Sequence, residues 1–249
     1  MINKTALITG ASGGIGRVTA KYLAEKGVRI IVHYNKNYIA AKSLKDSLPG
    51  NGHTLLQADF SEENNFETII EKCINKSGGI DFLINNAGIY IEKKFEDFDF
   101  NQWKQIWDTT ISVNLTSVAH LSYAVANHMI SAGGGKIINI SSRGAFRGEP
   151  NALAYGASKA GLNSLGQSMA QALAPHKIFI YTIAPGFVET DMAQTALNSP
   201  EGSAIKAQSP LNRVARPEEI AHTIGFLLSE ENEFLTGSII DINGASYLR

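Results

Sequence analysis

Short apolar runs rich in valine and isoleucine alternate along the chain with segments whose apolar residues recur every three or four positions. Several of the short runs are apolar at consecutive positions, which is typical of strands that helices cover on both faces. The pattern predicts seven strands, at Thr5–Thr9, Arg29–Tyr34, His53–Ala58, Asp81–Asn85, Lys136–Ser141, Ile178–Ala184 and Ser238–Ile242.

The segments between these strands have the period of a helix. The first is marked by Ile15, Val18 and Tyr22, and the others are Ile39–Leu48, Asn64–Asn75, Asn101 to about Ile130, Leu153–Ala174 and Pro217–Leu228. This succession predicts an α/β fold with a doubly wound parallel sheet, helices on both faces and right-handed crossovers. No linker, repeat or low-complexity tract interrupts the pattern, so we expect one domain over residues 1–249.

The composition is that of an ordinary globular protein, with 44% hydrophobic residues, 18% charged residues and a net charge of −1. So small a charge gives no reason to expect a nucleic acid or an anionic membrane as partner. No apolar run approaches the roughly 18 residues of a membrane span. One cysteine and no Cys/His cluster argue against an internal disulfide and a metal site. The first residues lead directly into a predicted strand without a secretory signal, so we expect a cytoplasmic protein.

A glycine-rich turn follows the first predicted strand and opens a helix. Glycines there allow a tight turn and let the backbone approach a pyrophosphate at the positive end of the helix. The candidate cofactor-binding residues are Thr9, Gly10, Ser12, Gly13, Gly14, Ile15 and Gly16. The spacing is G-x-x-x-G-x-G and not the usual G-x-G-x-x-G, so a plain strand-to-helix connection is the alternative.

The second predicted strand ends without the acidic residue that usually accepts a hydrogen bond from the ribose of NAD. Asn35 and Lys36 stand there and could contact a 2′-phosphate, which favours NADP(H) over NAD(H). Alternatively, Lys36 is an ordinary solvated lysine. After the third strand, Asp59 could accept from the adenine amino group or cap the next helix, and Phe60 beside it is also a candidate cofactor contact.

Two further turns at strand ends carry candidate cofactor contacts. Asn85 closes the fourth strand and is followed by Asn86, Ala87 and Gly88, where a cofactor ring can come close or a simple polar turn can form. After the sixth strand, the candidates are Pro185, Gly186, Val188 and Thr190, with Thr190 suited to the nicotinamide carboxamide. The stretch from Asp191 to Leu211 has weak periodicity and small polar residues, which predicts a mobile lid over the substrate.

Ser142, Tyr155 and Lys159 bring together a hydroxyl, a phenol and an ammonium. Because residues four apart share a helix face, Tyr155 and Lys159 are expected to be neighbours. Lowering a phenol pKa from about 10 to about 7 takes roughly 4 kcal/mol, and a nearby ammonium acts in that direction. Tyr155 would then give its proton to a carbonyl oxygen held by Ser142 as hydride reaches the carbon. The alternative is a solvated helix face. Asn114, inside a helical pattern, could hold a water that relays protons to Lys159 or could bind a backbone carbonyl.

Taken together, these residues resemble the short-chain dehydrogenase/reductase family over nearly the whole chain. The matching pieces are TGASGGIG at Thr9–Gly16, NNAG at Asn85–Gly88, Asn114-Leu115, the Ser142/Tyr155/Lys159 spacing, PGFVET at Pro185–Thr190, and the tail NRVARPEEIA…LTGSIIDINGA. The resemblance implies a Rossmann-like sheet in the order 3-2-1-4-5-6-7 and a catalytic tetrad of Asn114, Ser142, Tyr155 and Lys159. It also implies that Lys159 contacts the nicotinamide ribose, that the Val188 backbone meets the carboxamide, and that the protein is a homotetramer packed through its two long helices.

Within that family the chain looks most like the 3-oxoacyl-[acyl-carrier-protein] reductases, which implies NADPH-dependent reduction of a 3-oxoacyl thioester. The same chemistry on a sugar, a steroid or a small secondary alcohol is the alternative, and a non-catalytic cofactor-sensing scaffold is a third. Gly13 stands where many NADP-dependent members carry a basic residue, and the stretch from Gly88 to Asn114 is a few residues longer than usual. Positive charge for an acidic carrier protein is sparse; Arg143 and Arg147 supply some of it or are surface charges on a loop.

Overall fold

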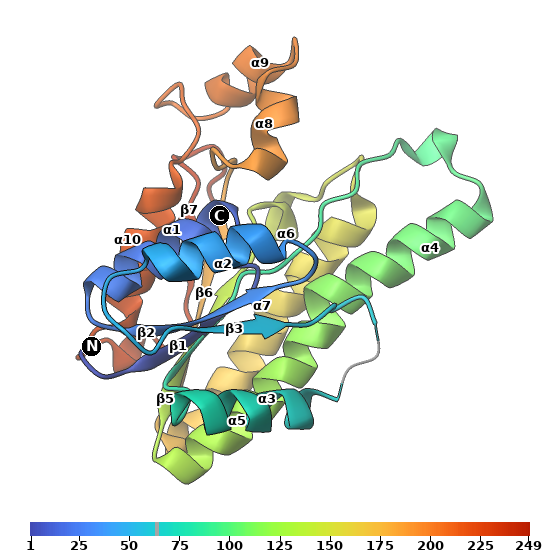
Figure 1. Ribbon diagram of the computed structural model, residues 1–249. Coiled ribbons are helices and arrows are strands. Elements are labelled where there is room, and N and C mark those ends of the chain that lie inside the picture. The colour runs from blue at the N-terminus through green and yellow to red at the C-terminus, as the bar shows by residue number, and fades with distance from the viewer. Residues whose placement is uncertain (63–64) are drawn as a thin grey trace.

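The strands form one parallel sheet whose side chains are mostly buried. The computed structural model describes residues 1–62 and 65–249, and within them seven strands pair in the order β3-β2-β1-β4-β5-β6-β7 (Figure 1). The strands are β1 Thr5–Ile8, β2 Arg29–Tyr34, β3 Thr54–Gln57, β4 Phe82–Asn85, β5 Gly135–Ile140, β6 Ile178–Pro185 and β7 Ile239–Ile242. Each lies within one residue or so of its predicted bounds, and the predicted order and fold class are confirmed.

Helices cover both faces of this sheet. They are α1 Gly14–Glu25, α2 Tyr38–Ser47, α3 Phe66–Ser77, α4 Phe100–Ile111, α5 Ser117–Ala132, α6 Gly144–Arg147, α7 Leu153–Leu173, α8 Asp191–Leu197, α9 Gly202–Ala207 and α10 Pro217–Leu228. One apolar core joins the sheet to α1, α2 and α10, and a second core joins its other face to α3, α5 and α7.

The alternation of side chains along a strand explains the two cores. Ala6 and Ile8 of β1 point into the first core, whereas Leu7 between them points into the second, as a side-chain period of two requires. All three are fully buried. At about 25 cal/mol per Å² of apolar surface removed from water, two such cores supply most of the driving force that holds the sheet in place. The loops at the carboxyl ends of the strands are therefore carried on a rigid frame.

The long helix expected from Asn101 to about Ile130 is divided into three parts. Between α4 and α5 the residues Ser112–Thr116 form a π-helical turn, which contains the buried Asn114. Such turns inside α-helices are frequent at functional sites. A capping box of Asp99 and Gln102 starts α4, and Gly133, with φ of 91°, ends α5. The period of apolar residues passes through the π turn unchanged, so the sequence pattern did not reveal it.

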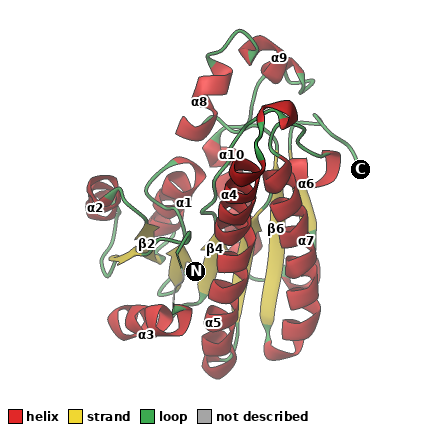
Figure 2. Ribbon diagram, turned by 90° about the vertical axis from the view of Figure 1, so that its right-hand side faces the viewer, coloured by secondary structure: helices red, strands yellow, loops and turns green. Residues whose placement is uncertain are grey.

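Two other elements differ from expectation. The predicted lid contains two short helices, α8 and α9, where weak periodicity indicated none, and Figure 2 shows them beyond one end of the sheet. The helix predicted at Asn64–Asn75 corresponds to α3, which begins at Phe66 and is capped by the Asn65 side chain; its predicted first residue, Asn64, lies outside the described residues. Among the described residues, no helix is long and apolar enough to cross a membrane.

Candidate functional site

The glycine turn between β1 and α1 is fixed to the end of β4. The Thr9 hydroxyl oxygen accepts from the backbone N–H groups of Asn86 and Ala87, both at 2.9 Å. In return, the Asn86 side-chain amide donates to the Thr9 carbonyl at 2.8 Å. A side chain at Gly16 would place its Cβ only 2.6 Å from the Asn86 amide nitrogen and from the Gly10 carbonyl. The turn therefore requires glycine at that position for packing.

The same turn presents an open helix end. Gly10 and Gly14 have φ of +63° and +51°, in the left-handed region that favours glycine. Gly13, the N-cap of α1, provides no side-chain cap, and the first N–H groups of a helix have no partner within the helix itself. Ser12, Gly13, Gly14 and Ile15 are all partly exposed. This geometry fits a pyrophosphate, as the sequence predicts.

The loop after β6 meets this turn from the opposite side. A Cβ on Gly14 would lie 3.3 Å from the Thr190 methyl carbon, so Thr190 lies directly against the helix end. Val188 is buried and forms an isolated parallel bridge with Ala215, which anchors the loop that begins at Pro185 and Gly186. The predicted contacts from the two turns are thus brought together at one edge of the sheet.

His33, at the end of β2, holds the other side of the glycine turn. Its Nδ1 accepts from the Gly10 N–H at 3.0 Å, and its Nε2 contacts the Ala58 carbonyl at 3.1 Å. These partners define the neutral tautomer with the proton on Nε2, because Nδ1 must accept. The ring stacks on Phe60 with centroids 4.3 Å apart, and burial lowers the pKa of His33 to about 4. Sequence reasoning missed this role; the signal was a histidine inside a buried strand.

Asn35, Lys36 and Asp59 lie beside this histidine at the outer end of the site. Asn35 and Lys36 are exposed, and Asn35 shares a hydrogen bond with Asp59. The Asp59 carboxylate accepts from the Ser61 hydroxyl at 2.6 Å and from its N–H at 2.9 Å, and these bonds hold its pKa below the usual range. Asp59 does not cap the next helix, since Asn65 does so. Asn35, Lys36 and Asp59 thus form a polar, at least partly exposed group at the carboxyl ends of β2 and β3.

Buried amides tie the ends of β4 and β5 together. The Asn85 amide nitrogen donates to Ser122 Oγ and to Asn139 Oδ1, both at 2.9 Å. Just beyond it, a Cβ on Gly88 would lie 3.2 Å from Asn114 Oδ1 and 3.6 Å from Lys159 Nζ. Asn114 and Lys159, which are 45 positions apart in sequence, therefore converge on the NNAG segment.

Tyr155 and Lys159 are neighbours on the first turns of α7, and Ser142 stands at the end of β5. The Tyr155 hydroxyl shares a hydrogen bond with the Ser142 side chain. Lys159 Nζ donates to the Ile140 carbonyl at 2.8 Å and lies 5.6 Å from the centre of the Tyr155 ring. The predicted neighbours are thus brought together. Sequence reasoning missed Tyr90, whose ring meets that of Tyr155 edge-on at 4.9 Å.

The expected lowering of the Tyr155 pKa is wrong. Burial raises the pKa of Tyr155 to about 12, and its hydrogen bond with Ser142 opposes this only in part. The Lys159 ammonium donates to the Ile140 carbonyl, and burial lowers the Lys159 pKa to about 8. At neutral pH Tyr155 therefore holds its proton and Lys159 is mostly charged. A protonated phenol beside a serine hydroxyl is the state that a proton donor to a carbonyl requires.

The interpretation of Arg143 as a loop charge is also wrong. Arg143 is 3% exposed, whereas Arg147 is exposed and lies 3.6 Å from Glu149. Among the described residues, no group of three or more His, Cys, Asp or Glu side chains could hold a metal ion. The site is thus built from backbone N–H groups, amides, hydroxyls and the ammonium groups of Lys36 and Lys159, a donor set that fits a dinucleotide.

A parallel sheet with a glycine turn, and a Ser-Tyr-Lys group at the carboxyl ends of its strands, defines a dinucleotide-dependent oxidoreductase class. Residues 4–201 match the family model described as short chain dehydrogenase. The chain is 36% identical over 245 residues to the 3-oxoacyl-[acyl-carrier-protein] reductase FabG of Vibrio cholerae and to that of Escherichia coli, with 98% of each chain covered. It is 34% identical to that of Thermotoga maritima, with 97% of this chain and 96% of the relative covered. The chain belongs to the short chain dehydrogenase family.

Solved structures agree with this assignment. A dehydrogenase/reductase from Sinorhizobium meliloti superposes with a TM-score of 0.90 at 27% identity, covering 100% of this chain and 96% of that one. A short chain dehydrogenase from Burkholderia cenocepacia, in complex with NADP, superposes with a TM-score of 0.88 at 28% identity and 98% coverage of both. The family predicted from the motifs is therefore confirmed, and the chain is an oxidoreductase similar to 3-oxoacyl-[acyl-carrier-protein] reductases.

Proposed function

We propose that the chain reduces the ketone of a 3-oxoacyl thioester, linked to acyl carrier protein or coenzyme A, to the 3-hydroxyacyl thioester with NADPH. The observation that carries the proposal is the hydrogen bond between Tyr155 and Ser142. Lys159 lies one helical turn after Tyr155 on α7, and its ammonium donates to the Ile140 carbonyl at the end of β5. Relatives at 36% identity are named as reductases of this substrate class, which supports the choice of thioester.

Each member of the tetrad has a distinct part in the proposed reaction. A bound nicotinamide supplies a hydride to the ketone carbon. Ser142 holds the carbonyl oxygen, and the Tyr155 hydroxyl gives its proton to that oxygen, so that the ketone becomes a secondary alcohol. The phenolate left behind is stabilised by the Ser142 hydrogen bond and by the charge of Lys159. Asn114, beside Lys159, completes the path by which the proton is replaced from solvent.

The cofactor is proposed to lie along the two glycine-lined turns. Gly10 to Gly16 would receive the pyrophosphate at the α1 end, with Asp59 and Phe60 at the adenine, and Asn35 and Lys36 at a ribose 2′-phosphate. Thr9, Asn86, Ala87 and Gly88 would line the middle of the site. Pro185, Gly186, Val188 and Thr190 would meet the carboxamide, and Tyr155 and Lys159 the nicotinamide ribose. A structural relative in complex with NADP supports this cofactor. Titration of NADPH against NADH tests it, and a preference for NADH would reverse the assignment.

Tyr155→Phe tests the proton donor. The variant keeps the ring contact with Tyr90 and removes only the hydroxyl. Turnover should fall by about 10²–10⁴, while binding of NADPH, followed by quenching of protein fluorescence, stays near the wild-type level. Tyr123→Phe, an exposed phenol on α5, is the matched control and should keep full turnover. Unchanged kcat in Tyr155→Phe would contradict the assignment.

A rate comparison tests the substrate. We expect a higher kcat/KM for an acetoacetyl thioester than for a panel of sugar, steroid and small aliphatic ketones. A clear preference for one of those simple ketones would favour the same chemistry on another alcohol or ketone. A homotetramer, a cytoplasmic location and a single domain over residues 1–249 stay predictions; light scattering would test the first of them.

A further inference from the structure

Arg143 directly follows Ser142 and carries a buried charge without a counter-charge. It is 3% exposed, and no described carboxylate lies within ion-pair distance of it. Glu149 acts on it electrostatically but pairs with Arg147 at 3.6 Å. Charges removed from water are costly unless they are paired. Contact with solvent therefore does not explain why an arginine stands at this position.

The contacts of Arg143 are neutral and few. Nη1 donates to the Ser246 hydroxyl at 2.5 Å, Nη2 donates to the Gln208 side-chain oxygen, and the guanidinium lies 5.4 Å from the centre of the Phe187 ring. A guanidinium has five N–H donors, and only two of them have protein acceptors in the described part of the chain. Burial lowers the pKa of Arg143 from its ordinary value, yet the group stays charged at physiological pH.

The guanidinium lines a cavity of about 70 Å³ between the lid, defined as residues 191–211, and the loops after β6 and β7. Phe187, Ser209, Arg213, Asn243 and Ser246 are among the other lining residues. Since a well-placed water needs about 10–15 Å³ of such volume, the cavity is large enough for a small polar group. It lies at the same edge of the sheet as Ser142.

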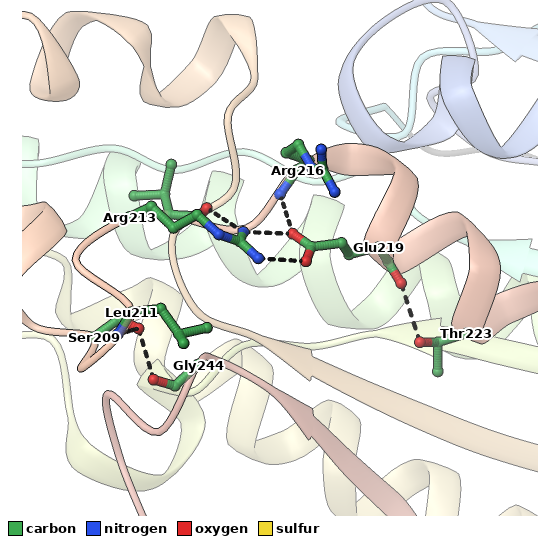
Figure 3. A network of polar contacts seen from close by, with 8 residues as sticks. Ser209, Leu211, Arg213, Arg216, Glu219, Thr223 and Gly244 are labelled. Atoms are coloured by element: carbon green, nitrogen blue, oxygen red, sulfur yellow. Dashed lines mark hydrogen bonds and ion pairs between the residues drawn. The ribbon is translucent and has the colours of Figure 1, made fainter.

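The wall of the cavity is held by polar contacts, which Figure 3 shows from close by. The Ser209 hydroxyl donates to the Gly244 carbonyl at 2.7 Å, so the lid is joined to the segment after β7. Arg213 grips Glu219 with two hydrogen bonds of 2.7 and 2.8 Å, and the Arg216 N–H donates to the same carboxylate at 2.8 Å. Glu219, which lines the cavity, is thus already paired with Arg213, and its charge does not neutralise Arg143.

We propose that this cavity receives a carboxylate at the far end of the substrate, with Arg143 as its receptor. A guanidinium is suited to a carboxylate because its fork of N–H donors matches two oxygens. The reacting ketone would be held at Ser142 and the terminal carboxylate at Arg143, the next residue. The acyl chain would then be fixed both at its third carbon and at its far end. This inference rests on the proposed reduction at Ser142 and Tyr155, and it narrows the substrate class to acidic 3-oxoacyl thioesters.

A matched substrate pair tests the inference. The N-acetylcysteamine thioesters of 3-oxohexanoate and 3-oxoadipate have the same number of carbons and differ in a terminal methyl against a carboxylate. With saturating NADPH, the wild-type protein should favour the acidic thioester by about tenfold or more in kcat/KM, as one charge-assisted hydrogen bond allows. Arg143→Gln should abolish that preference while changing the rate with the methyl-ended thioester by less than about threefold.

Two further variants test whether Arg143 binds the carboxylate or only holds the lid in place through its hydrogen bond to Gln208. Arg143→Lys keeps the charge and should retain part of the preference. Gln208→Leu removes the lid contact of Arg143 but leaves the guanidinium, so it should keep the preference for the acidic thioester. If Arg143→Gln lowered kcat/KM equally for both thioesters, and Gln208→Leu did the same, the inference would be overturned. Arg143 would then act only by holding the lid in place. Thermal melting of each variant shows whether it is folded.

A binding measurement keeps this test separate from the proposed function. If the protein reduces neither thioester, the proposed substrate class fails, and the Arg143 site is still open to a direct probe. Glutarate should raise the melting temperature of the wild-type protein in a saturable manner, and it should raise that of Arg143→Gln little or not at all. Equal shifts in both proteins, or none in either, would show that the cavity does not bind a carboxylate through Arg143.

Discussion

Asn114 brackets the backbone of Ile89. Its side-chain oxygen accepts from the Ile89 N–H at 2.8 Å, and its side-chain nitrogen donates to the Ile89 carbonyl at 2.9 Å and to Ser158 Oγ at 3.3 Å. The side chain thus ties the π turn between α4 and α5 to the loop after β4. Of the two roles expected for this asparagine, binding to the backbone is the one its contacts display, and any proton relay through it must work alongside these bonds.

Asn114→Leu should therefore weaken both the fold and the site. The substitution leaves the N–H and carbonyl of the partly buried Ile89 without the partner that Asn114 supplied, at up to about 1–3 kcal/mol for each group that water does not reach. Chemical denaturation should give a free energy of unfolding lower by about 3 kcal/mol, with reduced kcat at temperatures where the variant is folded. Asn151→Ala, which removes an exposed amide with only a 3.5 Å contact, is the control. Wild-type stability in Asn114→Leu would show that the bracket has no structural weight.

The glycine turn offers a paired test. Gly16→Ala places a Cβ 2.6 Å from the Asn86 amide and from the Gly10 carbonyl, so the turn must shift. At Gly13, by contrast, a Cβ meets no atom within 4 Å and the backbone is extended, with φ of −152°. We expect Gly16→Ala to lower NADPH affinity at least about tenfold, since pyrophosphate contacts depend on close backbone approach. Gly13→Ala should bind NADPH as the wild type does. Equal affinities in isothermal titration would contradict this reading of the turn.

Much of the frame could be predicted from the sequence, because buried parallel strands and amphipathic helices leave periodic signals. The seven strands follow from such signals, and the meeting of Ser142, Tyr155 and Lys159 follows from their spacing. The order of the strands comes instead from the resemblance to the short-chain dehydrogenase/reductase family. The π turn at Ser112–Thr116 left no trace in the period of apolar residues. The raised pKa of Tyr155 and the burial of Arg143 could not be predicted either. Both depend on which residues surround these side chains in the folded protein.

The rate of ketone reduction should depend on pH through Lys159. Because burial lowers the Lys159 pKa to about 8, the ammonium is lost as the pH rises through about 8, and kcat/KM for reduction should fall there. Deprotonation of Lys159 does not unfold the protein, so the decrease in kcat/KM does not come from a loss of stability. The Lys159 pKa is lower in the folded state than the ordinary 10.5, so the unfolded state binds more protons and stability rises with pH between about 8 and 10.5.

Two lysine variants check the origin of that limb. Lys159→Met should show low activity and no fall near pH 8 in a kcat/KM profile measured with saturating cofactor. Lys136 is also buried, but its ammonium caps α10 by donating to the carbonyls of Leu227 and Ser229, away from the site. Lys136→Met should keep the wild-type profile. A limb near pH 8 that persists in Lys159→Met would assign it to another group.

His33 makes the fold sensitive to acid. Its folded pKa of about 4 lies below the ordinary 6.5, so the unfolded state binds the proton first as the pH falls. The stability that His33 contributes is therefore fully present above pH 6.5 and is lost between 6.5 and about 4, by about 3 kcal/mol at 1.36 kcal/mol per unit. Protonation of Nδ1 also removes the acceptor of the Gly10 N–H, so NADPH binding should weaken over the same range.

Urea denaturation at a series of pH values measures this loss. His33→Asn keeps a polar side chain at the position but cannot take up the proton, so its stability should fall less steeply between pH 6.5 and 4 than that of the wild type. His53→Asn, at the far end of the sheet where His53 Nδ1 accepts from the Ile30 N–H, leaves His33 in place and should keep the steep fall. Parallel curves for the wild type and His33→Asn would mean that the proton is taken up elsewhere. The glycine turn would then hold its shape in acid without the neutral imidazole.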